Sequence, residues 1–159
     1  MNIAAQPPVQ ADQTIYLKDY QKPSFLVESI NLNIQVYDDH TIVDSTLVMK
    51  RQTAGELVLL GRDLELKSVQ LNGQTLSAEQ YHLDTEQLVI TDAPDEVIVQ
   101  TQVIIHPESN TQLEGLYKAG DLFVTQNEPE GFRKITFYPD RPDVLAEFTT
   151  RVEADKKYP

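Results

Sequence analysis

The chain has 159 residues, of which 40% are hydrophobic and 8% aromatic, enough apolar material for one domain with its own core. With 13 Lys and Arg against 25 Asp and Glu, the formal net charge is −12, which disfavours binding to nucleic-acid phosphates and to anionic membranes. The sequence contains no Cys, which excludes disulfides and thiolate metal ligands and favours a reducing compartment.

The first residues are polar and unpatterned. Residues 1–14 include two prolines and no hydrophobic period, so we expect a loose tail, followed by one domain over residues 15–159. The start has neither the basic residues nor the apolar run of a secretory signal. Because no apolar run approaches the roughly 20 residues needed to span a bilayer, we expect a soluble, cytoplasmic protein that contacts neither membranes nor nucleic acid.

Residues 29–37 alternate strictly between apolar and polar side chains. Alternation with a period of two is typical of a strand that is packed on one face and hydrated on the other. The pattern predicts that one face carries Ile30, Leu32, Ile34 and Val36, and the opposite face Asn31, Asn33 and Gln35.

Further short strands follow in chain order. The sequence predicts them over residues 41–51, 57–60, 66–71, 87–91 and 97–105. Asn72-Gly73 suits a type I′ hairpin turn, and Ser77–Gln80 is a candidate for one helical turn. No stretch has a convincing 3.6-residue period, so the strands and the turn residues between them predict an all-β, antiparallel β-sandwich.

The residues alone present no catalytic constellation. The three histidines, His40, His82 and His106, have no HExxH spacing. The sequence also lacks a glycine-rich nucleotide loop, a Gly-x-Ser-x-Gly elbow and a cysteine nucleophile.

Three motifs occur in order between residues 113 and 145. They read Leu-Glu-Gly-Leu-Tyr from Leu113, Thr-Gln-Asn-Glu from Thr125, and Asp-Arg-Pro-Asp-Val-Leu from Asp140. Together they resemble the N-terminal domain of the aminopeptidase N family of zinc metallopeptidases, bacterial branch. The resemblance is strongest over residues 109–159 and looser over residues 16–108, where Asp19-Tyr20 and Asp63-Leu64 agree.

The resemblance implies a saddle-like β-sandwich that lies against a downstream thermolysin-like catalytic domain and forms part of the active-site wall. The parent protein would hydrolyse single residues from peptides that have a free N-terminus. Its Zn²⁺ would be bound outside this chain by an HExxH pair and a distant Glu, so we expect no metal ligand and no catalytic residue within the 159 residues. The fragment alone is expected to be inactive.

The same resemblance implies substrate-binding roles for Glu128 and Gln126. Glu128 would hold the α-ammonium of the substrate, and Gln126 would line the same site. A fixed carboxylate opposite the charged amine lets an exopeptidase select the chain end. The sequence departs from common bacterial members at Asn127, where Cys is frequent, and at Pro129, where Ala is frequent.

Glu130 is a competing candidate for the amine anchor, since an extended segment would point it to the same side as Glu128. We favour Glu128, because its offset from Gln126 fits the family's motif. The neighbouring charged residues are expected to fix the fold or to contact the next domain, and the aromatic ones to pack: Arg133, Asp140, Arg141 and Asp143, then Tyr117, Phe132, Phe137 and Tyr138.

Two alternatives stay open at this point. The chain could be a free-standing β-sandwich interaction module, although the absence of Trp weighs against sugar stacking. It could also belong to a non-catalytic scaffold homologue whose metal ligands are lost.

Overall fold

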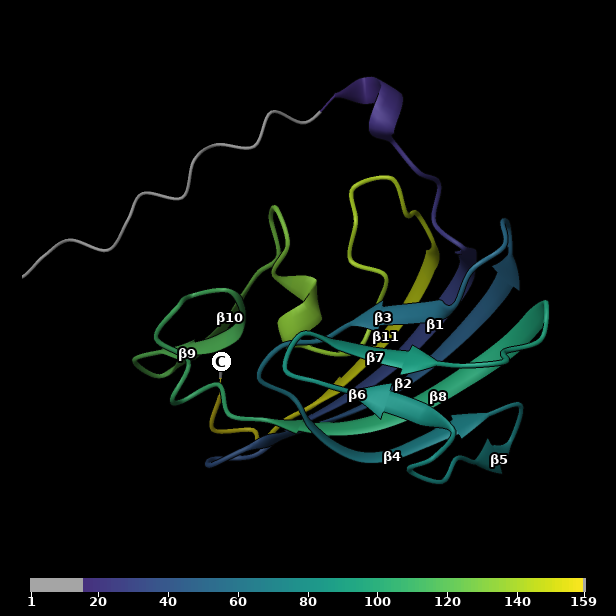
Figure 1. The fold of residues 1–159 in the computed structure, drawn as a ribbon. Helices are drawn as coiled ribbons and strands as arrows, with labels where there is room; N and C mark the ends of the chain where they lie inside the picture. The colour runs from purple at the N-terminus through teal and green to yellow at the C-terminus, as the bar shows by residue number, and fades with distance from the viewer. Residues whose placement is uncertain (1–15, 159) are drawn as a thin grey trace, which may run out of the picture.

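The computed structural model describes residues 16–158, whose regular secondary structure is almost entirely β (Figure 1). The elements are η1 (Leu17–Asp19), β1 (Phe25–Val36), β2 (Thr41–Arg51), β3 (Leu57–Leu60), β4 (Glu65–Leu71), β5 (Gln74–Thr75), β6 (Tyr81–Leu83), β7 (Gln87–Ile90), β8 (Glu96–Ile105), β9 (Gly115–Ala119), β10 (Leu122–Gln126), η2 (Phe132–Lys134) and β11 (Glu147–Glu153).

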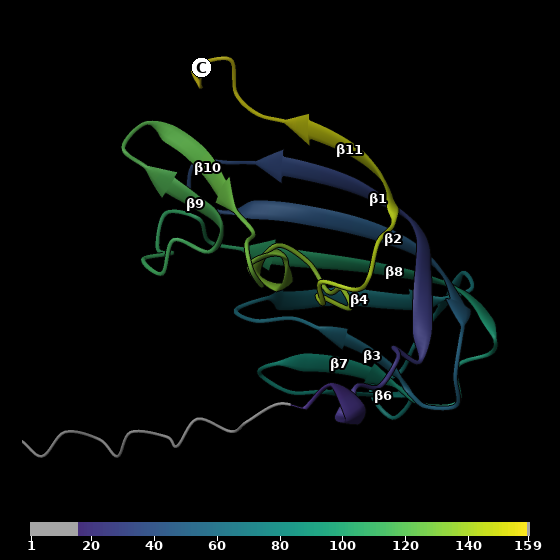
Figure 2. The same cartoon turned by 90° about the horizontal axis from the view of Figure 1, so that it is seen from above.

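The strands form a large sheet, a small sheet and a hairpin. The large sheet has the order β11-β1-β2-β8-β4-β5, the small one β3-β7-β6, and β9 pairs with β10. Neighbouring strands are antiparallel except β1 and β11, which are parallel. Figure 2 shows the curved large sheet, with the small sheet at one end and the β9–β10 hairpin at the other. The predicted all-β sandwich is confirmed, with one parallel pair added.

Alternation of buried and exposed residues accounts for the central strands of the large sheet. In β8 every second residue from Val97 to Ile105 is buried, because these residues face the core. In β1 the buried face runs through Phe25 and Val27 and then changes phase to Ile30, because a bulge shifts the register between Val27 and Ser29. The register of β1 after the bulge matches the sequence prediction.

The core lies between the two sheets. Its largest fully buried side chains come from both sheets and from the segment after η2. They include Ile30, Leu47, Met49, Leu57, Leu59, Leu88, Ile90 and Phe137. The segment after η2 is held by two backbone hydrogen bonds between Leu60 and Tyr138, of 2.8 and 3.0 Å.

The turn predictions have different outcomes. Asn72 and Gly73 both have positive φ, of 51° and 79°, as the type I′ hairpin between β4 and β5 requires. Ser77–Gln80 forms a hydrogen-bonded turn and not a helix, because Gln80 is followed directly by β6 at Tyr81. The side chain of Gln80 accepts a hydrogen bond from the Ser77 amide at 2.9 Å, closing the turn.

Strands β6, β9, β10 and β11 were not among the sequence predictions. β11 is exposed along its whole length, so no hydrophobic alternation marks it. The predicted tail over residues 1–14 lies outside the described residues. Across residues 16–158, the structure contains no helix that is both long and apolar enough to cross a membrane.

Candidate functional site

The two predicted substrate-binding residues lie at the end of β10. Gln126 is the last residue of this strand and pairs with Gly115 of β9. Glu128 follows in the turn, and both side chains are exposed. The Gln126 side-chain amide donates a hydrogen bond to the Glu128 carbonyl oxygen at 3.1 Å. The structure therefore brings the two residues together, through the main chain of Glu128 and not through its carboxylate.

The two glutamates of this turn have different surroundings. The Glu130 carboxylate lies 3.1 Å from the Arg133 guanidinium. Within residues 16–158 the Glu128 carboxylate accepts no hydrogen bond and forms no ion pair. A carboxylate that is already paired offers less to a second cation, so the two acids of this turn differ in what they can still bind.

Two glycines let the turn from Gln126 to Gly131, called the site turn below, pack closely on the β9–β10 hairpin. The Gly131 amide donates to the Asn127 carbonyl oxygen at 2.8 Å, closing the turn that carries Glu128. A Cβ at Gly131 would lie 2.9 Å from the Asn127 Cα and 3.0 Å from the Gly115 nitrogen. Gly115 itself has φ +71° and would place a Cβ 2.7 Å from the Lys134 Cβ. Side chains at these positions would separate η2 from β9.

Arg133 connects the site turn to the loop that follows Tyr138. Its backbone N–H and its Nε each donate to Asp140 Oδ2 at 3.1 Å, and a terminal nitrogen donates to the Asp140 carbonyl oxygen at 2.9 Å. The Arg133 and Asp140 side chains are only 11% and 12% exposed. The pair is therefore a shielded anchor beside the exposed turn.

A second ion pair fixes the start of the domain to the same loop. The Arg141 guanidinium donates to both carboxylate oxygens of Asp143, at 2.9 and 2.8 Å, and to the Gln21 carbonyl oxygen at 2.9 Å. The Tyr20 hydroxyl also donates to Asp143. These bonds, that from Arg141 first, lower the pKa of Asp143. The sequence expectation that Arg133, Asp140, Arg141 and Asp143 fix local structure agrees with these contacts.

An apolar groove of about 520 Å³ runs beside the site turn. The rings of Phe132 and Tyr138 pack edge to face in it, with centroids 5.1 Å apart, and Phe148 of β11 lies against both. Burial, with the charge of Asp140, raises the pKa of Tyr138 to about 12. Leu145 lines the groove and is 85% exposed. The groove is therefore an open, largely apolar surface that borders the turn at Asn127.

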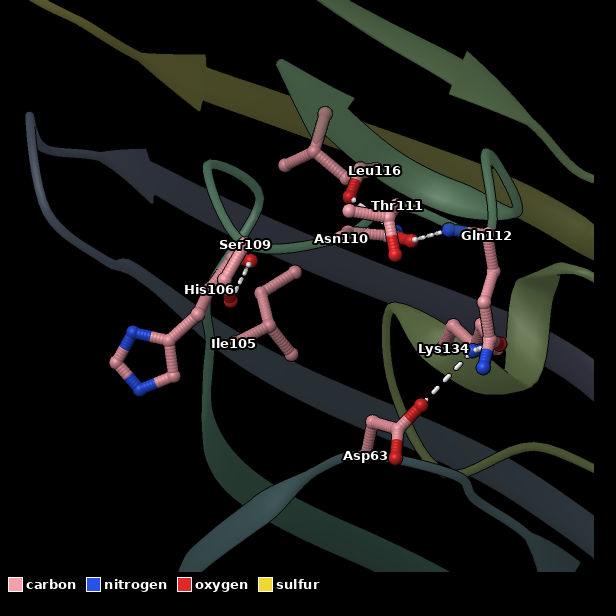
Figure 3. Close-up of a pocket in the computed structure, with 9 residues that line it drawn as sticks. All are labelled: Asp63, Ile105, His106, Ser109, Asn110, Thr111, Gln112, Leu116 and Lys134. Atoms are coloured by element: carbon pink, nitrogen blue, oxygen red, sulfur yellow. Dashed lines mark hydrogen bonds and ion pairs between the residues drawn. The ribbon is translucent and has the colours of Figure 1, made fainter.

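A second, polar cavity of about 340 Å³ lies on the other side of η2 (Figure 3). Lys134 at its edge is buried, with 4% of its side chain exposed, and its Nζ donates to Asp63 Oδ2 at 2.8 Å and to Gln112 Oε1. In Figure 3 the His106 imidazole points away from Lys134. Lys134 therefore ties η2 to the loops before β4 and β9.

Lys134 was not singled out from the sequence. In the sequence it is a lysine in the segment from Phe132 to Tyr138, where four apolar residues alternate irregularly with Arg133, Lys134 and Thr136. This is a weak signal because most lysines are exposed.

The histidines of this chain do not assemble a metal centre. His40 pairs with Asp39 at 2.7 Å, His82 lies 3.8 Å from Asp84, and His106 contacts the Asp39 carbonyl oxygen at 3.1 Å. Over the described part of the chain, no three His, Cys, Asp or Glu side chains are grouped so that they could hold a metal ion. These residues do not fit a zinc site, which has three or four such ligands.

Relatives of known sequence match most of the chain. Aminopeptidase N of Caulobacter vibrioides is 43% identical over 150 residues, which cover 92% of this chain and 17% of that protein. Aminopeptidase N of Escherichia coli is 41% identical over 153 residues, covering 94% of this chain and again 17% of the relative. The chain thus spans about a sixth of the length of these relatives.

Solved structures have the same fold. The aminopeptidase A of Legionella pneumophila, crystallised with aspartic acid, superposes with a TM-score of 0.82 and 27% identity, over 89% of this chain and 17% of that one. An M1 zinc metallopeptidase of Deinococcus radiodurans has a TM-score of 0.69 at 22% identity, over 82% of this chain and 32% of that one, which supports the fold alone. Residues 19–159 match the family described as the peptidase M1 N-terminal domain. The chain belongs to this family, and the resemblance to aminopeptidase N read from the three motifs is confirmed.

Proposed function

We propose that this chain is the amine-anchoring domain of a zinc-dependent aminopeptidase that removes N-terminal residues from peptides. One observation carries the assignment of the anchor. Of the two acids in the site turn, Glu130 is bound by Arg133 at 3.1 Å, whereas the exposed Glu128 carboxylate has no partner within residues 16–158. Glu128 is therefore the acid that can pair with an incoming ammonium group.

In this proposal the Glu128 carboxylate accepts charge-assisted hydrogen bonds from the α-ammonium of the peptide. Gln126 lines the same site, and its amide supports the main chain of Glu128. Fixing the charged end of the substrate sets the distance from the amine to the scissile bond, which reduces the entropic part of the barrier. An acetylated N-terminus lacks this charge and would be rejected.

The chemical step would take place on the remainder of the parent protein. This chain spans 17% of the length of its aminopeptidase N relatives, and its described residues do not fit a zinc site. We propose that the apolar groove, with Leu145 85% and Phe148 49% exposed, is covered by the downstream catalytic domain. Exposed apolar surface of this kind is typical of domain contacts. The cytoplasmic location also stays a prediction, supported by the absence of Cys from the sequence.

The test compares Glu128→Gln with wild type in the full-length protein, using an aminoacyl p-nitroanilide as substrate. We expect kcat/KM to fall by about 100-fold or more, since a desolvated charge pair is worth roughly 2–5 kcal/mol. Zinc content, measured by mass spectrometry, should stay at the wild-type level. Glu79→Gln removes an exposed acid from the Ser77–Gln80 turn and serves as the matched control.

A change of less than about 3-fold in Glu128→Gln would overturn the assignment of the anchor. A full-length protein without bound zinc and without turnover would instead support the scaffold alternative. The 159-residue chain alone should hydrolyse no aminoacyl substrate, with or without added zinc. Measurable turnover by it would contradict the proposal that the chemical step takes place on the remainder of the parent protein.

A further inference from the structure

Glu130 is the only acid of the site turn that is tied to the rest of the described domain by a side-chain ion pair. Its carboxylate lies 3.1 Å from a terminal nitrogen of Arg133, and 57% of its side chain is exposed. Arg133 is far less exposed, at 11%. The exposed end of this pair lies on the turn and the shielded end lies on η2.

Arg133 can serve as a fixed point because Asp140 already holds it. Three bonds of 2.9 to 3.1 Å join the two residues, two of them from the Arg133 side chain. The Arg133 carbonyl oxygen also accepts a hydrogen bond from the Arg62 amide at 2.9 Å, which holds the main chain. The two side-chain bonds to Asp140 restrict the movement of the Arg133 guanidinium. A guanidinium is planar and presents several donors in fixed directions, so it can bind Asp140 and Glu130 at once, which a lysine ammonium does less well.

The Gly131 carbonyl oxygen accepts a hydrogen bond from the Lys134 amide of η2 at 3.1 Å, which joins the end of the turn to η2 through the main chain. Two further contacts lie within the turn between Gln126 and Gly131. One is the Gln126 amide on the Glu128 carbonyl oxygen, at 3.1 Å, and the other is the Gly131 amide on the Asn127 carbonyl oxygen, at 2.8 Å. Both bonds close the turn on itself, and neither orients it against η2 through a side chain. The ion pair between Glu130 and Arg133 supplies that orientation two residues after Glu128.

We propose that Glu130 and Arg133 are positioning residues that set the location of the Glu128 carboxylate, with Asp140 as their anchor. The proposal rests on the function proposed above, because it takes Glu128 as the amine anchor. It assigns Glu130 a role different from that of a second amine ligand. Loss of the ion pair would keep the Glu128 carboxylate but would leave its position less well fixed.

The experiment measures recognition of the amine directly. Calorimetry on the full-length zinc-loaded protein compares leucine hydroxamate with 4-methylpentanohydroxamate, which has the same side chain and metal-binding group but no amine. The ratio of their dissociation constants isolates the contribution of the α-ammonium. We expect Glu128→Gln to bring this ratio close to one. Glu130→Gln and Arg133→Lys should each reduce it by about 5- to 10-fold, since small misplacements of a positioning group cost up to about 100-fold.

The amine-free inhibitor provides the internal reference. Its affinity should stay within about 2-fold of wild type in Glu130→Gln and Arg133→Lys, because neither residue contributes to binding it. Glu96→Gln breaks the exposed ion pair with Lys50 in the large sheet and should leave the ratio unchanged. Glu130→Gln keeps the side-chain shape at a largely exposed position, so it tests the proposal even where Arg133→Lys lowers the melting temperature.

The outcomes separate the two proposals. A wild-type ratio in Glu130→Gln and Arg133→Lys, combined with a collapsed ratio in Glu128→Gln, would overturn the positioning role and leave the amine anchor standing. A wild-type ratio in Glu128→Gln would overturn the amine anchor, and the positioning role with it. Equal loss in Glu130→Gln and Glu128→Gln would show that Glu130 binds the amine itself, which also contradicts the positioning role.

Discussion

Ser45 of β2 and Thr101 of β8 lie directly opposite each other in the large sheet, with both side chains facing the core. They are 3% and 4% exposed. Among residues 16–158 neither hydroxyl oxygen finds a hydrogen-bond partner. A buried hydroxyl without a partner costs free energy, because it loses its bonds to water and gains none in return.

Replacement of Thr101 by Val should therefore stabilise the chain. Valine keeps the branched shape and removes the unpaired hydroxyl, so we expect the free energy of unfolding to rise by about 1 kcal/mol. Urea unfolding of the 159-residue chain measures this change. The same substitution at the exposed Thr149 of β11 should change stability by less than about 0.5 kcal/mol. A destabilised Thr101→Val variant would mean that this hydroxyl is bonded in solution.

The ion pair between Lys134 and Asp63 predicts an unequal response to the loss of either partner. Lys134 is 4% exposed and Asp63 is 69% exposed. Asp63→Asn would leave a buried ammonium without its counter-charge, which should cost about 2–3 kcal/mol, below the roughly 3–5 kcal/mol of a fully buried pair. Lys134→Met should cost about 1 kcal/mol or less, because the remaining carboxylate is hydrated. Chemical unfolding of both variants checks the order, and the reverse order would contradict the burial argument.

Gly131→Ala should disturb the site turn by steric contact alone. Its φ of −84° suits alanine, but the added Cβ would meet backbone atoms of Gln126, Asn127 and Gly115. We expect a loss of about 1–3 kcal/mol, the range for overpacking. Gly73→Ala is the contrasting control, since it has φ +79° and open space around it and should cost about 1–2 kcal/mol through backbone strain. Denaturant unfolding measures both, and amide NMR shifts of residues 126–131 should change only in Gly131→Ala.

The pKa of His106 is raised and makes stability depend on pH. The main cause is the hydrogen bond to the Asp39 carbonyl oxygen, and the carboxylates of Glu65 and Glu108 add to it. Because the folded state raises this pKa, the protonated imidazole stabilises the fold. The full contribution is present below the unfolded pKa of about 6.5, and it is lost as the pH rises through the folded pKa. The stability difference between wild type and His106→Asn should therefore be larger at pH 6 than at pH 8.5. Urea unfolding at both values measures it, and a difference that does not change with pH would contradict the prediction.

The central strands were predictable because they bury one face. The predicted ends of β2 (Thr41–Arg51) and β3 (Leu57–Leu60) coincide with the observed ones. In β2 every second residue is buried from Thr41 to Met49, which is the condition under which alternation becomes visible in a sequence. β11 was missed because all seven of its residues are exposed, so burial imposes no pattern on them.

The site was predictable only in part. The resemblance singled out Gln126 and Glu128, and it favoured Glu128 over Glu130 because the offset of Glu128 from Gln126 fits the family's motif. The different surroundings of the two acids depend on Arg133, which lies on η2 and whose guanidinium is 3.1 Å from the Glu130 carboxylate. Its second partner, Asp140, lies seven residues further along the chain, across a turn whose geometry no local pattern encodes.

The parallel pairing of β1 with β11 also affects biosynthesis. Ser29 pairs with Glu147. The outer edge of β1 therefore stays unpaired until β11, about 118 residues further along the chain, has left the ribosome. At roughly 5–20 residues per second this interval is about 6–24 seconds. During that time the nascent chain exposes unpaired amides and carbonyls that other polypeptides could occupy. Chaperones that bind unpaired strand edges should therefore act on this chain until β11 has left the ribosome.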